Sequence, residues 1–170
     1  VLGRIYFPNM FQPVWLIEGL ATYEETEQTS GGRGRSPGAE MVIRTAVLEA
    51  WMIGDRPDLL ARVAAAEPDA ALRRQAIHLI GATGDGAALE TLYGQLKDAD
   101  DKAAVLKAFG IAGDDARLAR IARSERDPGL LRAALEGLGI SGGKEATAAI
   151  VEIYRATADA GIKRGAINGL

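Results

Sequence analysis

Few side chains in this 170-residue sequence are suited to catalysis or metal binding. The sequence contains no cysteine, which excludes disulfides, cysteine-ligated zinc and thiol nucleophiles. It contains one histidine, His78, so a metal site that needs two imidazoles is excluded as well. Among the carboxylates, Glu18 stands out because it lies within the stretch QPVWLIEGLATYEE. A carboxylate can ligate zinc, but a single one binds the ion with negligible affinity.

The stretch around Glu18 reads as one amphipathic helix. Pro13 suits the first turn of a helix, and Trp15, Leu16 and Leu20 supply an apolar face for packing. The pattern resembles the W-L-x-E-G-[FL]-A-x-Y helix of gluzincin metallopeptidases. In that family two histidines of an H-E-x-x-H helix bind zinc, and a downstream glutamate is the third ligand. The resemblance therefore implies this role for Glu18, and its other matching residues are Trp15, Leu16, Gly19 and Tyr23.

The first half of such a zinc site is missing from the sequence. The resemblance covers about residues 3–49, and no H-E-x-x-H motif occurs anywhere in the chain. Glu18 would bind metal only if a missing H-E-x-x-H were supplied, so we expect no cofactor and no peptide hydrolysis from this chain. The alternative is a fragment of a zinc-dependent gluzincin-type peptidase whose H-E-x-x-H lies outside the chain. The sequence begins with Val1, so we expect it to be a piece of a longer protein.

A glycine-rich stretch, GGRGRSPG, follows this segment. Its Arg33 and Arg35, together with the backbone amides, could cradle a phosphate. The stretch lacks the Lys-Ser/Thr pair of a nucleotide-binding loop, and no buried strand is predicted before it. We therefore interpret it as a flexible linker.

Apolar residues recur at a fixed interval through the rest of the chain. Leu48 and Trp51 lie one helical turn apart, and the positions 29 residues further on, Ile77 and Ile80, are apolar as well. The same interval relates the members of two columns, which are Leu48, Ile77, Leu106 and Leu135, and Leu60, Leu89 and Leu118. Three extra residues interrupt the last unit around SGGKEA, after which the series resumes at Ile150 and Ile153. Each unit thus holds two short helices, and we expect no strands.

Turn signals separate these helices. WMIGD, GATGDG, GIAGDD and GISGGK place glycine at the end of the first helix, and a following aspartate can cap the second. EPDA, KDADD and RDPG end the second helix and begin the next unit. A single unit cannot bury its apolar stripe alone, so we expect neighbouring units to stack into a continuous core.

The units resemble HEAT repeats, as seen in DAALRRQAIHLIGATGD and DPGLLRAALEGLGISGG. The resemblance covers about residues 41–170. It implies an all-α fold, an α-solenoid of HEAT-type helix pairs with about four and a half units. The third unit departs from the pattern, with Asp101 where others have Leu or Ile and Ala103 where an Arg is usual. The final unit ends after one helix, so we expect self-association or missing chain to cover Ile167 and Leu170.

Arginine and lysine also follow this register. Their two columns are Arg44, Arg73, Lys102 and Lys163, and Arg74, Arg132 and Arg164. A basic stripe could bind an acidic protein, which makes Arg73, Arg74 and Arg132 the candidate protein-binding residues. The structural alternative, which we favour, is a ladder within the array. The resemblance to HEAT-type arrays implies that such an arginine pairs with an aspartate at the start of its own or the adjacent unit, and here Asp69 precedes Arg74, and Asp127 precedes Arg132, by five residues.

The composition argues against nucleic acid and membranes as partners. The net charge of −3 and the sequence pI of about 5.3 give no general attraction for phosphates. No aromatic residues are interleaved with the basic columns for base stacking, and no apolar run approaches the roughly 18 residues of a spanning helix. His78 occupies the position that Lys107 and Glu136 hold in later units, so we expect it at the surface.

Together these observations predict an all-α chain with two regions. Residues 1–38 form a peptidase-like helical segment with its glycine-rich linker, and residues 39–170 form a HEAT-repeat solenoid. The predicted function is a non-catalytic scaffold for a protein partner.

Overall fold

The computed structural model describes residues 37–170, and the peptidase-like stretch around Glu18 lies outside them. Every regular element within the described residues is an α-helix, and no strand occurs there. The all-α prediction is therefore confirmed for this part of the chain. The chain divides into two compact units, Val1–Arg44 and Thr45–Leu170. The boundary that the sequence predicts near residue 38 stays a prediction.

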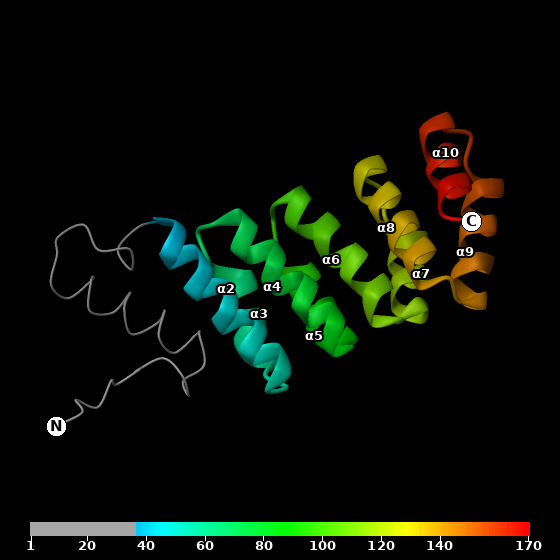
Figure 1. The fold of residues 1–170 in the computed structure, drawn as a ribbon. Coiled ribbons are helices and arrows are strands. Elements are labelled where there is room, and N and C mark those ends of the chain that lie inside the picture. The colour runs from blue at the N-terminus through cyan, green and yellow to red at the C-terminus, as the bar shows by residue number, and fades with distance from the viewer. Residues whose placement is uncertain (1–36) are drawn as a thin grey trace, which may run out of the picture. The chain divides into compact units, whose positions relative to one another are not determined.

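The described helices keep the interval of the sequence pattern (Figure 1). They are α2 Pro37–Ile53, α3 Pro57–Ala66, α4 Ala70–Thr83, α5 Gly86–Gln95, α6 Ala99–Ala112, α7 Asp115–Ser124, α8 Pro128–Ser141, α9 Lys144–Ala156 and α10 Ala160–Asn168. Helices α4, α6 and α8 begin 29 residues apart, and so do α3, α5, α7 and α9. The backbone thus repeats with the same period as the apolar side chains.

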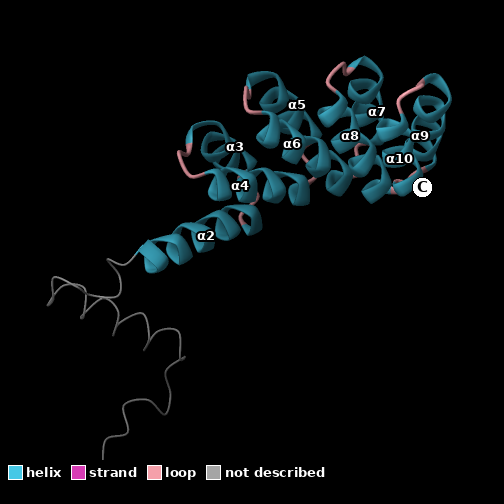
Figure 2. Cartoon of the chain, turned by 90° about the horizontal axis from the view of Figure 1, so that it is seen from above, coloured by secondary structure: helices cyan, strands magenta, loops and turns pink. Residues whose placement is uncertain are grey.

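Two layers of helices make up the unit Thr45–Leu170. Figure 2 shows α4, α6, α8 and α10 along one side and α3, α5, α7 and α9 along the other. In the first layer α4 packs on α6, α6 on α8 and α8 on α10. In the second layer α3 packs on α5 and α7 on α9, while α5, α7 and α9 also pack on the first-layer helix before them. The result is a helical repeat-like array of stacked helix pairs.

Aspartate residues begin most of these helices. The Asp69 carboxylate, for example, accepts hydrogen bonds from Ala71 N at 2.8 Å and Leu72 N at 3.0 Å. A side-chain cap of this kind contributes about 1 kcal/mol to helix stability. The predicted capping by the aspartate after the glycine turn is confirmed for Asp85 and Asp114, and it is wrong for Asp55, because Arg56 precedes α3 and no side chain caps that helix. Asp69, Asp98 and Asp127 cap α4, α6 and α8 as well.

Glycines in the left-handed conformation end the first helix of three units. Gly84, Gly113 and Gly142 have φ angles of 79°, 70° and 66°, which side chains other than glycine rarely adopt. The equivalent residue of the first unit is Asp55, with a φ angle of 51°. In the first unit α2 ends at Ile53, directly before Gly54, so the expectation that glycine ends this helix is confirmed there, although the left-handed residue is Asp55.

The three extra residues of the last unit lengthen its second helix. Helix α9 has 13 residues, whereas α3, α5 and α7 have 10 each. Three residues make nearly one helical turn, so the insertion keeps the same face toward the core. Ile150 and Ile153 are accordingly buried.

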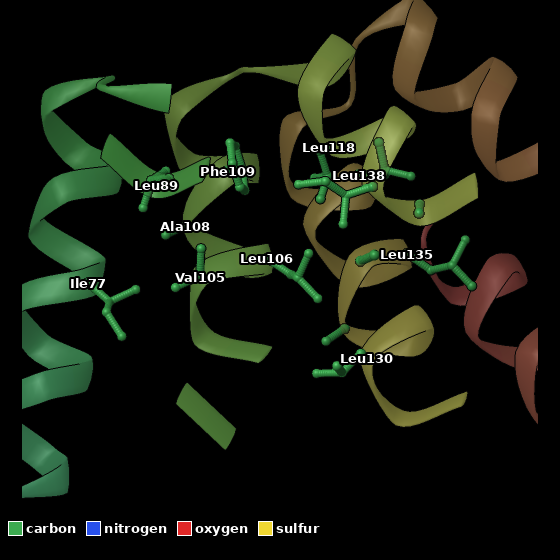
Figure 3. Packing of buried hydrophobic residues seen from close by; sticks show 14 of the residues in the cluster. Ile77, Leu89, Val105, Leu106, Ala108, Phe109, Leu118, Leu130, Leu135 and Leu138 are labelled. Atoms are coloured by element: carbon green, nitrogen blue, oxygen red, sulfur yellow. The ribbon is translucent and has the colours of Figure 1, made fainter. Parts of the chain in front are cut away.

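A continuous apolar core lies between the two layers (Figure 3). The column of Ile77, Leu106 and Leu135 is fully buried, and so is the column of Leu60, Leu89 and Leu118. Burying one such side chain contributes about 1.5–3 kcal/mol, and truncating it to alanine costs about 2–5 kcal/mol. The core therefore holds the successive units together.

Small residues let the first-layer helices approach closely. A Cβ atom added to Gly81 would lie 2.7 Å from the carbonyl oxygen of Ala108, and one added to Gly139 would lie 2.8 Å from the Cα of Gly169. Gly110 occupies the same position in α6, and its added Cβ would clash with the Gly137 carbonyl. Only glycine fits at these crossings, which fixes the spacing between neighbouring units.

Candidate functional site

Arg73, the first of the candidate protein-binding residues, is occupied by bonds within the array. Its Nε donates to the Oδ2 atom of Asp101 at 2.7 Å. Its Nη1 donates to the backbone oxygens of Glu67 at 3.0 Å and Pro68 at 2.9 Å. Arg73 thereby connects the turn before α4 to the first turn of α6. A partner could bind this guanidinium only by displacing internal hydrogen bonds.

Asp101 is the one buried charged residue among those described. It stands in the column of Leu72 and Leu130 and is 1% exposed. Besides Arg73, it faces the Nη1 atom of Arg74, which lies 3.7 Å from its Oδ1. That separation is too long for a hydrogen bond, and Oδ1 has no hydrogen-bond donor in the described structure. Two arginines of one unit therefore converge on one carboxylate of the next.

The pairs expected within one unit do not form, whereas the pairing expected with the adjacent unit occurs. Asp69 does not pair with Arg74, and Asp127 does not pair with Arg132, because both carboxylates accept backbone N–H groups at the start of their helices. Capping geometry turns these side chains toward the helix axis and away from the arginines. The ladder does link adjacent units at one point, through Asp101.

Arg132 is exposed and lies along α10. A Cβ atom added to Gly165 would lie 3.4 Å from its Cγ, and one added to Gly161 would lie 3.7 Å from its Nη1. Within residues 37–170 no hydrogen bond or ion pair involves its guanidinium. Of the three candidate arginines, Arg132 is therefore the most available to a partner. Arg74 is intermediate, since its side chain is 44% exposed and faces Asp101.

A second set of charges, which the sequence analysis missed, links the second-layer helices. Glu90 of α5 accepts hydrogen bonds from Arg117 at 3.1 Å and Arg120 at 2.7 Å, both on α7. Arg123 of α7 donates to Glu152 of α9 at 3.0 Å. The hydrogen bond from Arg120 lowers the pKa of Glu90 below its ordinary value. The separations of 27 to 30 residues, close to the repeat interval, were the signal that could have revealed these pairs.

Shallow hollows on the surface of residues 37–170 include the following two. One has a volume of about 720 Å³ and follows a single stripe of α9, which includes Lys144, Ala148, Val151 and Arg155. The other has a volume of about 400 Å³ and lies where the turns of successive units meet. Its wall includes Gly84, Gly113, Asp114, Asp115 and Glu145.

The described residues contain no cluster of side chains that could bind a metal ion. No group of three or more histidine, aspartate or glutamate side chains in residues 37–170 could hold a metal ion. Glu18, the predicted zinc ligand, lies outside the described residues. His78 is exposed on α4, as predicted, and no described helix is long and apolar enough to cross a membrane.

No family model, curated protein or solved structure matches the chain. The HEAT and gluzincin resemblances accordingly stay hypotheses based on the residues quoted above. In residues 37–170, charged and apolar surface residues recur at the repeat interval. The polar side chains that cluster there form ion pairs and helix caps.

Proposed function

We propose that this chain is a non-catalytic protein-interaction scaffold built on a HEAT-type α-solenoid. The proposal that the array is a solenoid is supported by the stacking of α4, α6, α8 and α10 and by the 29-residue repeat of the helix bounds. In such arrays each unit contacts only its neighbours, which leaves an extended surface for partners.

The observation that carries the functional proposal is a variable surface over a constant core. At one buried position the units have Ile77, Leu106 and Leu135, which are alike in chemistry. At the next position along the same helices they have His78, Lys107 and Glu136, which are exposed and differ in charge. Uniform core residues are enough for stacking. Surface residues that change from unit to unit give each stretch of the array its own recognition properties.

The scaffold function is tested by affinity capture from the source cells followed by calorimetry with the purified partner. The wild-type chain is compared with a double variant, Arg74→Glu/Arg132→Glu, which reverses charge at two exposed positions of the first layer. A scaffold returns a partner that binds directly and in fixed stoichiometry. A chain that captures no direct partner and instead turns over a substrate would overturn the proposal.

A protein is favoured over nucleic acid as the partner because the net charge is −3 and because Arg73 is engaged with Asp101. Nucleic-acid binding would weaken steeply with salt and would be lost in the Arg73→Ala/Arg74→Ala/Arg132→Ala variant. Binding of a partner that is independent of salt and unchanged in this variant would sink the nucleic-acid alternative.

The alternative enzymatic function depends on Glu18 alone. It holds that the chain is a fragment of a gluzincin-type peptidase, in which zinc would be bound by Glu18 and two histidines from elsewhere. Metal analysis of the purified chain tests this alternative, with Glu18→Ala as the control. Stoichiometric zinc that is lost in the variant would favour the peptidase, whereas the scaffold proposal expects none.

Self-association stays a second prediction about partners. Ile167 and Leu170, the apolar residues that the sequence singled out for it, are 59% and 67% exposed. Light scattering over a range of concentrations tests it, and a strict monomer at high concentration would count against it.

A further inference from the structure

An apolar column remains exposed along one edge of the array. Ile53, Ile111 and Ile140 are 81%, 39% and 55% exposed, and Ala82, also exposed, fills the fourth position of this column. Each of the four stands in the last turn of a first helix, directly before the turn to the second helix. Since the units repeat every 29 residues, these side chains follow one another along the edge. Exposed apolar residues that recur in register mark an interaction surface more strongly than single ones do.

Carboxylates flank this column. We call the four segments 53–58, 82–87, 111–116 and 140–145 the glycine-turn edge. It contains two basic residues, Arg56 and Lys144, against six acidic ones: Asp55, Asp58, Asp85, Asp114, Asp115 and Glu145. Two of the acids have cationic partners inside the array, since Arg56 pairs with Asp58 and Arg117 with Asp114. The edge is therefore acidic as a whole, and it repels phosphates and anionic lipids.

The hollow of about 400 Å³ lies within this edge. Three carboxylates, Asp114, Asp115 and Glu145, contribute to its wall. Ala112, which directly follows Ile111, is also part of the wall, so the hollow adjoins the apolar column. Helices α4 and α6 end beside the hollow and α7 and α9 begin there, so their dipoles oppose one another, and the attraction for a cation comes from the carboxylates.

The other end of the first-layer helices has a different charge. The segments 67–74, 96–103, 125–132 and 157–164 at this end hold eight basic residues, among them Arg73, Arg74 and Arg132, and eight acidic ones, so this end is neutral as a whole. A partner can therefore distinguish the two ends of these helices by charge as well as by the apolar column.

We propose that the glycine-turn edge binds a basic amphipathic segment of a protein partner. Apolar side chains of the segment pack on Ile111 and Ile140, and a lysine or arginine enters the hollow between Asp115 and Glu145. This inference rests on the scaffold function and specifies both the surface and the chemistry of the partner. The occupant is a basic peptide because the flanking acids complement it and would oppose an acidic one.

The test is a selection of random 16-residue peptides on the immobilised wild-type chain, followed by fluorescence polarisation with the enriched peptides. We expect enriched sequences to combine leucine, isoleucine or phenylalanine with lysine or arginine, and to bind more weakly as salt increases. The edge variant is Ile140→Ser/Glu145→Lys, in which both residues are exposed, so the fold should be retained. Its affinity should fall about tenfold or more, which corresponds to about 1.4 kcal/mol.

The matched control is Lys97→Glu/Arg126→Glu, at two exposed positions in the turns at the opposite end of the array, which should bind these peptides unchanged. Arg74→Glu/Arg132→Glu is compared as well, because these arginines are the other candidate surface. If the selected peptides depend on Arg74 and Arg132 and ignore the edge variant, the scaffold function stands and this inference is overturned. If no peptide binds, this inference is overturned, whereas the scaffold function is decided by the affinity capture described above. If the edge variant changes only the molar mass in light scattering, a second copy of the chain occupies the edge, and the inference is overturned as well. Circular dichroism of each variant confirms that it is folded.

Discussion

Lys102 lies over the ring of Tyr93, with its Nζ atom 5.1 Å from the ring centroid. The same relationship recurs two units later, where Lys163 lies 5.4 Å from the ring centroid of Tyr154. In each case the tyrosine is near the end of a second-layer helix and the lysine is in the first two turns of the next first-layer helix. Cation–π contacts of this kind therefore join helices across the two layers, at about 0.5–1 kcal/mol each when exposed.

The two tyrosines differ in one respect. The Tyr93 hydroxyl donates a hydrogen bond to Oε2 of Glu125, whose Oε1 accepts the backbone N–H groups of Arg126 and Asp127. Burial raises the pKa of Glu125, but the Tyr93 hydroxyl and these amides outweigh it, so the pKa is lowered overall. Tyr93 thereby connects α5 to the turn before α8, whereas the Tyr154 hydroxyl makes no hydrogen bond among the described residues.

We expect Tyr93→Phe to lower the free energy of unfolding by about 1 kcal/mol. The substitution removes the hydrogen bond to Glu125 and leaves the ring beneath Lys102, so the loss reports the hydroxyl alone. Tyr154→Phe is the matched control and should change stability by less than about 0.5 kcal/mol. Urea unfolding of both variants measures the difference, and equal effects would contradict the role given to Glu125.

The Tyr93 hydroxyl also makes stability depend on alkaline pH. Burial, and then the hydrogen bond with Glu125, raise the pKa of Tyr93 above its ordinary value. The unfolded chain ionises this tyrosine at about pH 10, whereas the folded chain holds its proton. Its contribution to stability is therefore fully present below about pH 10 and is lost as the pH rises toward the folded pKa. The stability advantage of the wild type over Tyr93→Phe should shrink between about pH 9 and 11. A constant difference across that range would contradict this assignment.

Helix boundaries and core residues follow from the sequence because local chemistry and periodicity determine them. Gly84 and Gly113 adopt a backbone conformation that other residues avoid, and Asp85 supplies an acceptor where a helix has free N–H groups. Ile77 and Leu106 are buried because the period of the chain brings them to one face. None of these features depends on which of several carboxylates an arginine pairs with.

The partners of the arginines could not be read in the same way. Asp69 lies five residues before Arg74, and Asp101 lies at the start of the next unit. The sequence alone favours Asp69 because it is closer along the chain. In the structure Asp69 caps the N-terminus of α4. Asp101 is therefore the carboxylate that Arg73 and Arg74 face. The contacts of Glu90 were missed for a related reason, since they depend on the lateral approach of α5 and α7.

Asp101→Ala should lower the free energy of unfolding by about 3 kcal/mol. The change leaves Arg73, whose side chain is only 20% exposed, without its carboxylate partner. The double variant Arg73→Leu/Asp101→Leu should recover most of this loss, because leucine stands at the equivalent positions 130 and 131. A double-mutant cycle in urea measures the coupling between the two residues.

An exposed ion pair in the same layer provides the control for this cycle. Lys107 and Glu136 approach to 2.6 Å, but both side chains are about half exposed, so Lys107→Ala should cost less than about 1 kcal/mol. Losses that simply add in the Arg73 and Asp101 double variant would show that the buried pair is not coupled.

Asp55→Gly should stabilise the chain by about 0.5–1 kcal/mol. Asp55 holds a φ angle of 51° at the position where later units have Gly84, Gly113 and Gly142. Glycine adopts this conformation without the steric cost that a Cβ atom brings, although the greater freedom of the unfolded chain offsets part of the gain. The reciprocal change, Gly84→Ala, should cost about 1 kcal/mol, since an added Cβ there meets open space and only the backbone conformation opposes it. Thermal unfolding of the two variants should therefore shift in opposite directions. A decrease for Asp55→Gly would mean that the aspartate contributes a contact that outweighs its backbone strain.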